Sequence, residues 1–210
     1  MDSLSNYRNR ALASLENNWG KAVIVTIVVL LISLLFQGGI QIAFSFGGKL
    51  SKLTSNIFAA LILIPISWAF KVFFLRMLRG ENLGVKNLFD GFSDYGRILL
   101  AIVLKNVYIF LWTLLLIVPG IYKSFSYALT EFVLLDHPEM NGEQAIKESM
   151  RLMDGRKMAL FLLLLSFIGW LILSFITLGL GFIFLFPYVQ TAMAHFYEDA
   201  VKEDGASISD

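Results

Sequence analysis

The chain has 210 residues and a net charge of +1; 57% of its residues are hydrophobic and only 16% are charged. A typical soluble domain is about 45–50% apolar and about 25% charged, so this composition indicates a membrane protein. The absence of cysteine excludes disulfides, thiolate metal sites and cysteine nucleophiles, and the balanced charge argues against a nucleic-acid partner.

The first 21 residues are polar, and the apolar run after them is too long for a signal peptide, so we expect a retained first span. A spanning helix needs about 20 mainly apolar residues. Six stretches approach or meet this requirement, at residues 22–44, 57–75, 98–118, 121–135, 158–178 and 180–196. The sequence predicts an all-α integral membrane protein, with a single membrane domain over 1–198 and a polar cytoplasmic tail over 199–210.

The stretch at 121–135 is the shortest of the six, and it contains Lys123 and Glu131. Two interpretations stay open: a buried, tilted helix, or a helix that stops short of full depth. If this stretch alone did not cross the membrane, Arg156 and Lys157 would lie outside the cell. Because lysine and arginine in short loops stay on the cytoplasmic side, this favours a stretch that crosses.

Lysine and arginine are concentrated in alternate loops. The basic set contains Arg8, Arg10, Lys21, Arg76, Arg79, Lys86, Arg97, Lys147, Arg151, Arg156, Lys157 and Lys202. The opposite set contains only Lys49, Lys52 and Lys123. Because the basic loops stay inside, we expect both termini to be cytoplasmic and the number of spans to be even.

Each segment that precedes an odd-numbered span has apolar residues at helical spacing. They are Leu4, Tyr7, Ala11, Leu12, Leu15 and Trp19, then Val85, Leu88, Phe89, Phe92 and Tyr95, then Ile146, Met150 and Met153. We expect interfacial amphipathic helices on the cytoplasmic side, with their apolar faces in the inner leaflet. The alternative is that these faces pack on one another or on the ends of the spans.

Three apolar runs each begin just after a glycine that is next to a basic residue. The three segments are NNWGK (17–21), DYGR (94–97) and DGRK (154–157). Glycine frees the backbone for a sharp change of direction, and the neighbouring base suits lipid phosphates. Gly20, Gly96 and Gly155 are therefore predicted hinges between an interfacial helix and a spanning helix.

When the sequence is aligned with itself at an offset of about sixty residues, the end of the chain matches its middle. Gly181 then aligns with Gly120, Tyr188 with Tyr127 and Thr191 with Thr130. The first third fits more loosely. The pattern predicts three parallel repeats of interfacial helix, hinge and helical hairpin. Such repeats imply a pseudo-threefold arrangement about the membrane normal, unlike the inverted repeats of many transporters.

Several motifs resemble domain-of-unknown-function family 975, a family of bacterial polytopic membrane proteins. They are LWTLLLIVPGIY (111–122), ESMRLMDGRK (148–157), LSFIGWLIL (165–173), ITLGLG (176–181) and PYVQTAMAHFYE (187–198). The resemblance implies a bacterial cytoplasmic-membrane protein with about six helices, and it carries no activity. More distantly, the chain resembles the membrane portion fused to some glycerophosphodiester phosphodiesterases, whose catalytic barrel it lacks.

No motif indicates catalysis. The two histidines, His137 and His195, lack metal-ligand spacing. The segment GFSDYG (91–96) differs from the G-x-S-x-G nucleophile elbow, because Tyr95 stands in place of the second glycine. We expect no enzyme activity, no catalytic residue, no cofactor and no metal site.

Four ionisable residues lie within the predicted spans, toward their cytoplasmic ends: Lys71, Lys105, Glu131 and His195. Such groups are costly in a bilayer and usually face protein or water, so they are candidates for a polar cavity open to the cytoplasm. Snorkelling to the headgroups is the alternative for Lys71. Residue counts from the turn at Pro119 and Gly120 predict that Glu131 approaches Lys105, with Lys71 as the alternative partner.

Gly39, Ala43 and Gly47 form a small-residue face in the first predicted span, flanked by Gln37 and Gln41. Small faces let helices approach closely, and the glutamines are able to hydrogen-bond across the contact. Packing within the monomer is the commoner use of such a face. Self-association is the alternative.

Two functions stay open from the sequence. The first is a non-enzymatic membrane protein that acts through lipid or partner membrane proteins at the inner leaflet, with a homo-oligomer as one such assembly. The second is a small transporter or channel, whose substrate site is the cavity near Glu131, Lys105 and His195.

Overall fold

The computed structural model of the chain describes residues 4–36 and 48–208, and each regular element in those ranges is a helix. The elements in chain order are α1 (Leu4–Glu16), α2 (Trp19–Leu34), α4 (Gly48–Leu78), the 3-10 helix η2 (Val85–Phe92), α5 (Tyr95–Leu115), α6 (Ile117–Ser126), α7 (Thr130–Asp136), α8 (Gly142–Leu152), α9 (Lys157–Leu165), α10 (Ile168–Ile176) and α11 (Phe182–Ile208). The all-α prediction is confirmed for the described residues.

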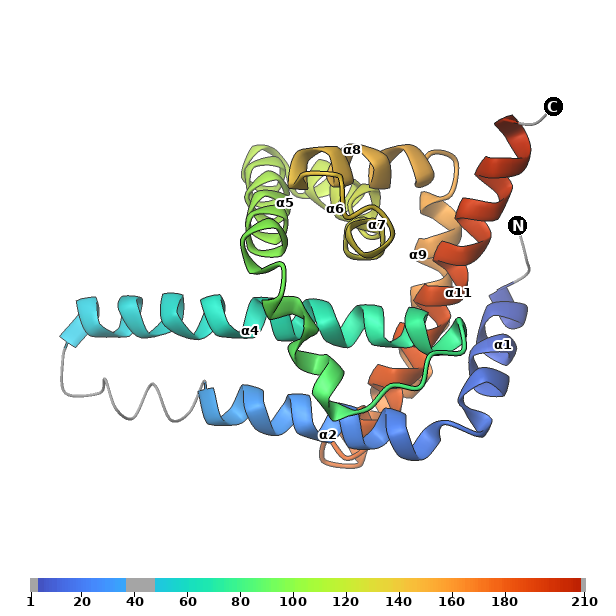
Figure 1. The fold of residues 1–210 in the computed structure, drawn as a ribbon, viewed down its shortest axis with the longest axis horizontal. Helices are drawn as coiled ribbons and strands as arrows, with labels where there is room; N and C mark the ends of the chain where they lie inside the picture. Colours follow the sequence, from blue (N-terminus) through green and yellow to red (C-terminus); the bar gives the residue numbers. More distant parts are fainter. Residues whose placement is uncertain (1–3, 37–47, 209–210) are drawn as a thin grey trace.

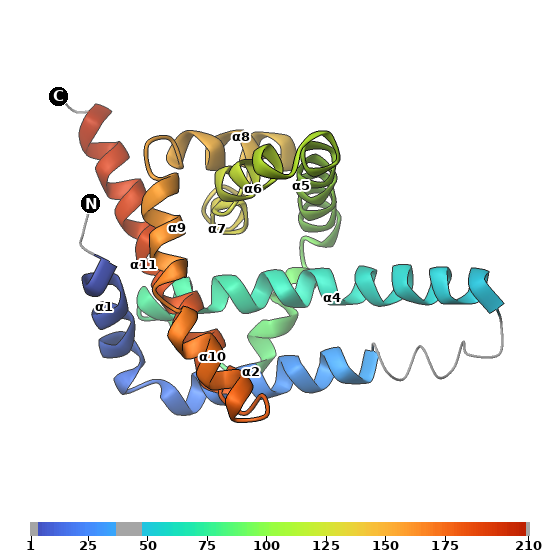
Figure 2. The ribbon, with the colours of Figure 1, turned by 180° about the vertical axis from the view of Figure 1, so that it is seen from behind.

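Three helical hairpins point in different directions from a common centre (Figures 1 and 2). The α2–α4 hairpin runs to the left in Figure 1, the α10–α11 turn points downward, and the α5–α6 hairpin is seen nearly end-on. At the centre, α4 contacts both α7 and α11. The rings of Phe132 in α7 and Tyr197 in α11 stack there at 5.2 Å, and Phe73, Phe74 and Phe196 are fully buried.

A peripheral helix packs on each hairpin, and it packs mainly on a hairpin other than the one that directly follows it in sequence. Helix α1 packs on α9 and α11, η2 on α2 and α4, and α8 on α5 and α7. The apolar faces of α1 and α8 lie inside the protein, since Tyr7, Leu15 and Ile146 are buried. For these two segments the structure shows the alternative interpretation: their apolar faces pack on other helices. Exposed apolar side chains remain at Leu12 in α1 and at Phe89 and Phe92 in η2.

The chain breaks its helices close to all three predicted hinges. Helices α1 and α2 meet at 95°, and turns separate η2 from α5 and α8 from α9. Gly20 and Gly96 are, however, the second residues of α2 and α5, and only Gly155 lies in a turn with a positive φ of 70°. A requirement for glycine therefore applies at Gly155 alone, because other L-residues are strained in that conformation.

Replacing Gly155 with alanine is expected to destabilise the protein by about 1–2 kcal/mol, the cost of a left-handed conformation for an L-residue. Gly20→Ala is the matched control, because a methyl group there meets nothing within 4 Å. Alanine has the higher helix propensity, so the control should be neutral or stabilising by up to about 1 kcal/mol. Thermal unfolding of the two variants in detergent measures the difference, and equal melting temperatures would contradict the strained turn.

Three helices are long and apolar enough to cross a membrane: Asn56–Leu78, Tyr95–Leu115 and Lys157–Ile176. The number rises to four if the bent pair Ser5–Glu16 and Trp19–Leu34 forms one span. The predicted span at 121–135 is instead two short helices, α6 and α7, separated by a turn at 127–129. The predicted span at 180–196 falls in α11, which continues through most of the predicted tail to Ile208.

The predicted small-residue face of Gly39, Ala43 and Gly47, with Gln37 and Gln41 beside it, lies outside the described residues.

Candidate functional site

Three of the four predicted ionisable residues meet at the junction of α4, α5 and α7. The Nζ of Lys71 lies 2.7 Å from Oε1 of Glu131, and the Nζ of Lys105 contacts the same oxygen. The predicted approach of Lys105 to Glu131 is confirmed, and the alternative partner is present at the same time. The Trp68 indole fixes the backbone nearby, donating to the carbonyl oxygen of Glu131 at 3.1 Å.

This Lys–Glu–Lys cluster is almost entirely enclosed by protein. Glu131 is 3% exposed and Lys105 is 8% exposed, whereas the Lys71 side chain is 37% exposed and brings the cluster to the surface. Two ammonium groups and one carboxylate leave a formal charge of +1. The second carboxylate oxygen of Glu131, Oε2, is buried without a hydrogen-bond partner among the described residues. A buried acceptor of this kind carries a desolvation cost, which the two lysines offset through Oε1.

His195 lies apart from this cluster and links α11 to α1. Arg10 Nη2 lies 3.3 Å from His195 Nδ1, and Ser14 Oγ lies 2.9 Å from His195 Nε2. A guanidinium only donates, so Nδ1 accepts and the ring is the neutral Nε2–H tautomer. The same Arg10 forms an ion pair with Asp199 at 2.5 Å. His195 is thus part of the contact between the two ends of the chain.

A second polar network, which the sequence did not reveal, joins the ends of α4 and α7 to the middle of α11. Arg79 donates to both carboxylate oxygens of Asp136, at 2.5 and 2.7 Å, and to Glu198 at 2.8 Å. The Tyr197 hydroxyl donates to Asp136 at 2.8 Å. The hydrogen bonds that Arg79 donates to Asp136 raise the pKa of Arg79 above its usual value, and the bidentate geometry fixes the end of α7 beside the end of α4.

The bases beside the predicted hinges each hydrogen-bond to a protein group. Arg97 donates to the carbonyl oxygens of Leu134, His137 and Met140, and so caps the end of α7. Lys21 donates to Asn82 at 3.0 Å, and Lys157 donates to the Tyr122 hydroxyl at 3.1 Å. Arg97 also pairs with Asp94, so the donors of this guanidinium bind protein groups, and its expected contact with lipid phosphates stays a prediction.

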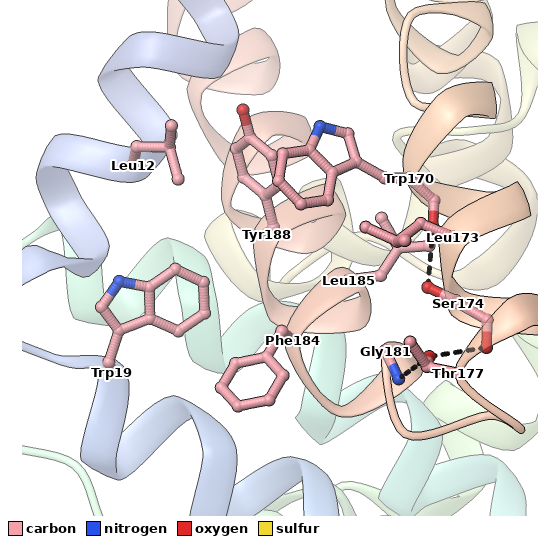
Figure 3. A pocket seen from close by; sticks show the side chains of 10 residues that line it. All are labelled: Leu12, Trp19, Trp170, Leu173, Ser174, Thr177, Gly181, Phe184, Leu185 and Tyr188. Carbon is pink, nitrogen blue, oxygen red and sulfur yellow. Dashed lines mark hydrogen bonds between the residues drawn. The ribbon is translucent and has the colours of Figure 1, made fainter.

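Three pockets among the described residues are apolar. One pocket of about 330 Å³ lies between α1, α2, α10 and α11 (Figure 3). Two others, of about 280 and 290 Å³, lie beside α6 and α9 and between α9, α10 and α11. None of these three pockets is lined by Lys71, Lys105, Glu131 or His195.

Residues 113–204 match the model of a family described as a protein of unknown function, DUF975. The resemblance to DUF975 is confirmed over these residues. The DUF975 match runs from the end of α5 into α11, and it includes Glu131 but neither lysine of the cluster. No curated protein and no solved structure matches the chain.

Proposed function

We propose that the chain is an integral protein of the bacterial cytoplasmic membrane, with six membrane-crossing helices and cytoplasmic termini. The observation that carries this proposal is the apolar surface of the candidate spans. On α5, Leu100, Phe110 and Leu114 are exposed, and on α10 Phe175 and Ile176 are exposed. Water-soluble monomers rarely expose contiguous apolar patches larger than a few hundred Å², whereas lipid covers such a surface without cost.

The same proposal takes the three hairpins as repeats that are related by rotation about one axis. Two of them share a close contact at the tip: a methyl group on Gly120 would meet Thr113, and one on Gly181 would meet Ser174. Thr113 and Ser174 also both donate to the carbonyl four residues earlier. Each peripheral helix packs on the hairpin before its own, and α1 closes the ring on the last hairpin, as a threefold arrangement requires.

We propose no enzymatic activity for this architecture. Its polar groups are engaged in holding helices together, as at Arg79 and Arg97, and its described pockets are apolar. A protein of this kind acts through what its apolar surfaces contact, namely lipid or partner membrane proteins, a second copy of the chain included. The inner leaflet is the place of action, because the bases lie there in the proposed topology.

The second candidate function is a small transporter or channel, and the Lys–Glu–Lys cluster is the observation that favours it. Ionisable groups within membrane helices commonly mark ion or substrate pathways. The orphaned Oε2 of Glu131 supplies an acceptor that a proton or cation could use. A water-filled path from the cytoplasm to this cluster would distinguish a transporter from the non-transporting protein.

Both proposals are tested by single cysteines in a chain that has none. A membrane-impermeant maleimide should label Gly48→Cys in intact cells and Asn141→Cys only in opened cells, since Gly48, the first residue of α4, lies on the outer side in the proposed topology. Labelling of Asn141→Cys but not Gly48→Cys in intact cells would overturn the orientation. Thr130→Cys, beside Glu131 and fully buried, should stay unreacted from both sides. Its reaction from the cytoplasm would favour the transporter.

A further inference from the structure

The Lys–Glu–Lys cluster holds more positive than negative charge in an enclosed place. Lys71 and Lys105 contribute two ammonium groups, and Glu131 offsets only one of them. Lys105 is 8% exposed and Glu131 is 3% exposed, and among the described residues the charges that act on Lys105 are those of Glu131 and Lys71. An uncompensated charge away from water is costly. The cluster therefore favours a ligand that carries one negative charge over a metal cation.

The cluster also has hydrogen-bonding groups that are not paired with one another. In the part of the chain that the structure describes, each ammonium group donates to Oε1 of Glu131 and to no other acceptor. An ammonium group has three N–H donors, so two donors of the buried Lys105 lack a protein acceptor. Oε2 of Glu131 is the opposite case, since within the same ranges it is a buried acceptor without a donor. A ligand that fits must accept from the lysines and donate to Oε2.

We propose that the cluster binds one small monovalent oxyanion that carries a hydroxyl group, of which bicarbonate is the simplest. The charged oxygens of the anion accept from Lys71 and Lys105, and its hydroxyl donates to Oε2 of Glu131. These bonds are charge-assisted, the stronger class of hydrogen bond. The bound anion brings the formal charge of the cluster to zero. Nitrate and chloride have the same charge but no hydrogen to donate, so they would place their own lone pairs against those of Oε2.

The Lys71 side chain is the way into this site. It is 37% exposed, whereas the neighbours of Glu131 in α7, Thr130 and Phe132, are fully buried. A lysine stem is flexible, so the Lys71 ammonium is able to move off Oε1, admit the anion and close over it. The rest of the wall is packed protein, which restricts the ligand to a few heavy atoms.

The inference deepens the second candidate function by naming the class of ligand, and it rests on that candidate for a path from the cytoplasm to the cluster. Binding itself does not require transport. The two ammonium groups and the carboxylate have the same chemistry in a protein that only holds the anion. Binding and transport are therefore measured separately.

The binding test uses ¹³C-labelled bicarbonate and the full chain purified in detergent, at a mildly alkaline pH where the monoanion predominates. Exchange with a site on the slowly tumbling protein broadens the NMR line of the free anion. We expect such broadening, and we expect unlabelled bicarbonate to reverse it. Nitrate should compete about tenfold more weakly or worse, because it cannot donate to Oε2 of Glu131. Absence of broadening, or equal competition by nitrate, would overturn the proposal.

Three variants locate the site. Lys105→Met removes the excess charge and the buried donors, and should abolish the broadening. Lys86→Gln is the matched control, because Lys86 is an exposed lysine of η2 outside the cluster, and it should broaden the line as the wild type does. Glu131→Gln leaves two positive charges and an amide that both donates and accepts, so nitrate should compete as well as bicarbonate. Full broadening in Lys105→Met would reject the site even if Glu131→Gln does not fold.

Uptake of labelled bicarbonate into liposomes that contain the protein separates this proposal from the transporter on which its path rests. Selective binding without uptake, together with an unreacted Thr130→Cys, would keep the anion site and reject the transporter. Uptake of nitrate and bicarbonate at equal rates, without selective binding, would keep the transporter and reject the hydroxyl-bearing anion as its ligand.

Discussion

Glu131→Gln is expected to destabilise the protein by about 3–5 kcal/mol, the usual cost of removing one partner from a buried ion pair. The carboxylate accepts from Lys71 and Lys105 through the same oxygen, and it is the only acidic group in the cluster. Its loss leaves two ammonium groups close together around a neutral amide. Both repulsion and the uncompensated burial of Lys105 then act against the folded state.

Thermal unfolding in lipid nanodiscs measures this loss, and a compensating variant tests its cause. Lys105→Met in the Glu131→Gln background removes the buried unpaired charge, so the double variant should recover much of the lost melting temperature. Lys71→Met should recover less, because the Lys71 side chain is 37% exposed and already reaches solvent or headgroups. Glu139→Gln, in an exposed loop, is the control and should leave the melting temperature unchanged. Equal melting of Glu131→Gln and wild type would contradict a stabilising role for the cluster.

The contact of Glu131 with the two lysines, Lys71 and Lys105, could be predicted because it depends on how deep each residue lies in its predicted span. Antiparallel helices joined by a short turn place residues at similar depth when they are equally far from that turn. Counting from Pro119 and Gly120 therefore brought Lys105 and Glu131 within the length of a lysine stem. The count gives no information on rotation about the helix axis, so it could not show that His195, at a comparable depth, faces α1.

The environment of the amphipathic segments could not be predicted for a related reason. Periodicity identifies the apolar face of a helix, and lipid and protein are equally apolar neighbours for it. Tyr7 and Leu15 were recognised as one face, but only the fold shows that α9 and α11 cover it. The Arg79 and Arg97 networks were missed because their partners are carboxylates and carbonyls at helix ends distant in sequence. Such ends come together only once the three hairpins are placed.

Alanine at Gly120 or Gly181 is expected to destabilise the two hairpin tips by about 1–3 kcal/mol, the usual cost of overpacking. A methyl group on Gly181 would lie 2.7 Å from the Cα of Ser174, and one on Gly120 would lie 2.7 Å from the Cα of Thr113. The hydroxyl oxygens of Thr113 and Ser174 also obstruct the methyl groups, but rotating these side chains leaves the contact with the backbone Cα in place. The two helices of each hairpin must move apart instead.

Gly169→Ala is the matched control for this pair, since Gly169 is in α10 of the same hairpin and a methyl group there meets nothing within 4 Å. It should be neutral or stabilising by up to about 1 kcal/mol through helix propensity. Ser174→Ala should rescue Gly181→Ala only in part, because it removes the hydroxyl but leaves the Cα in place. Equal melting temperatures for Gly181→Ala and Gly169→Ala would show that the tips are not closely packed, and would remove the contact that the second and third hairpins share.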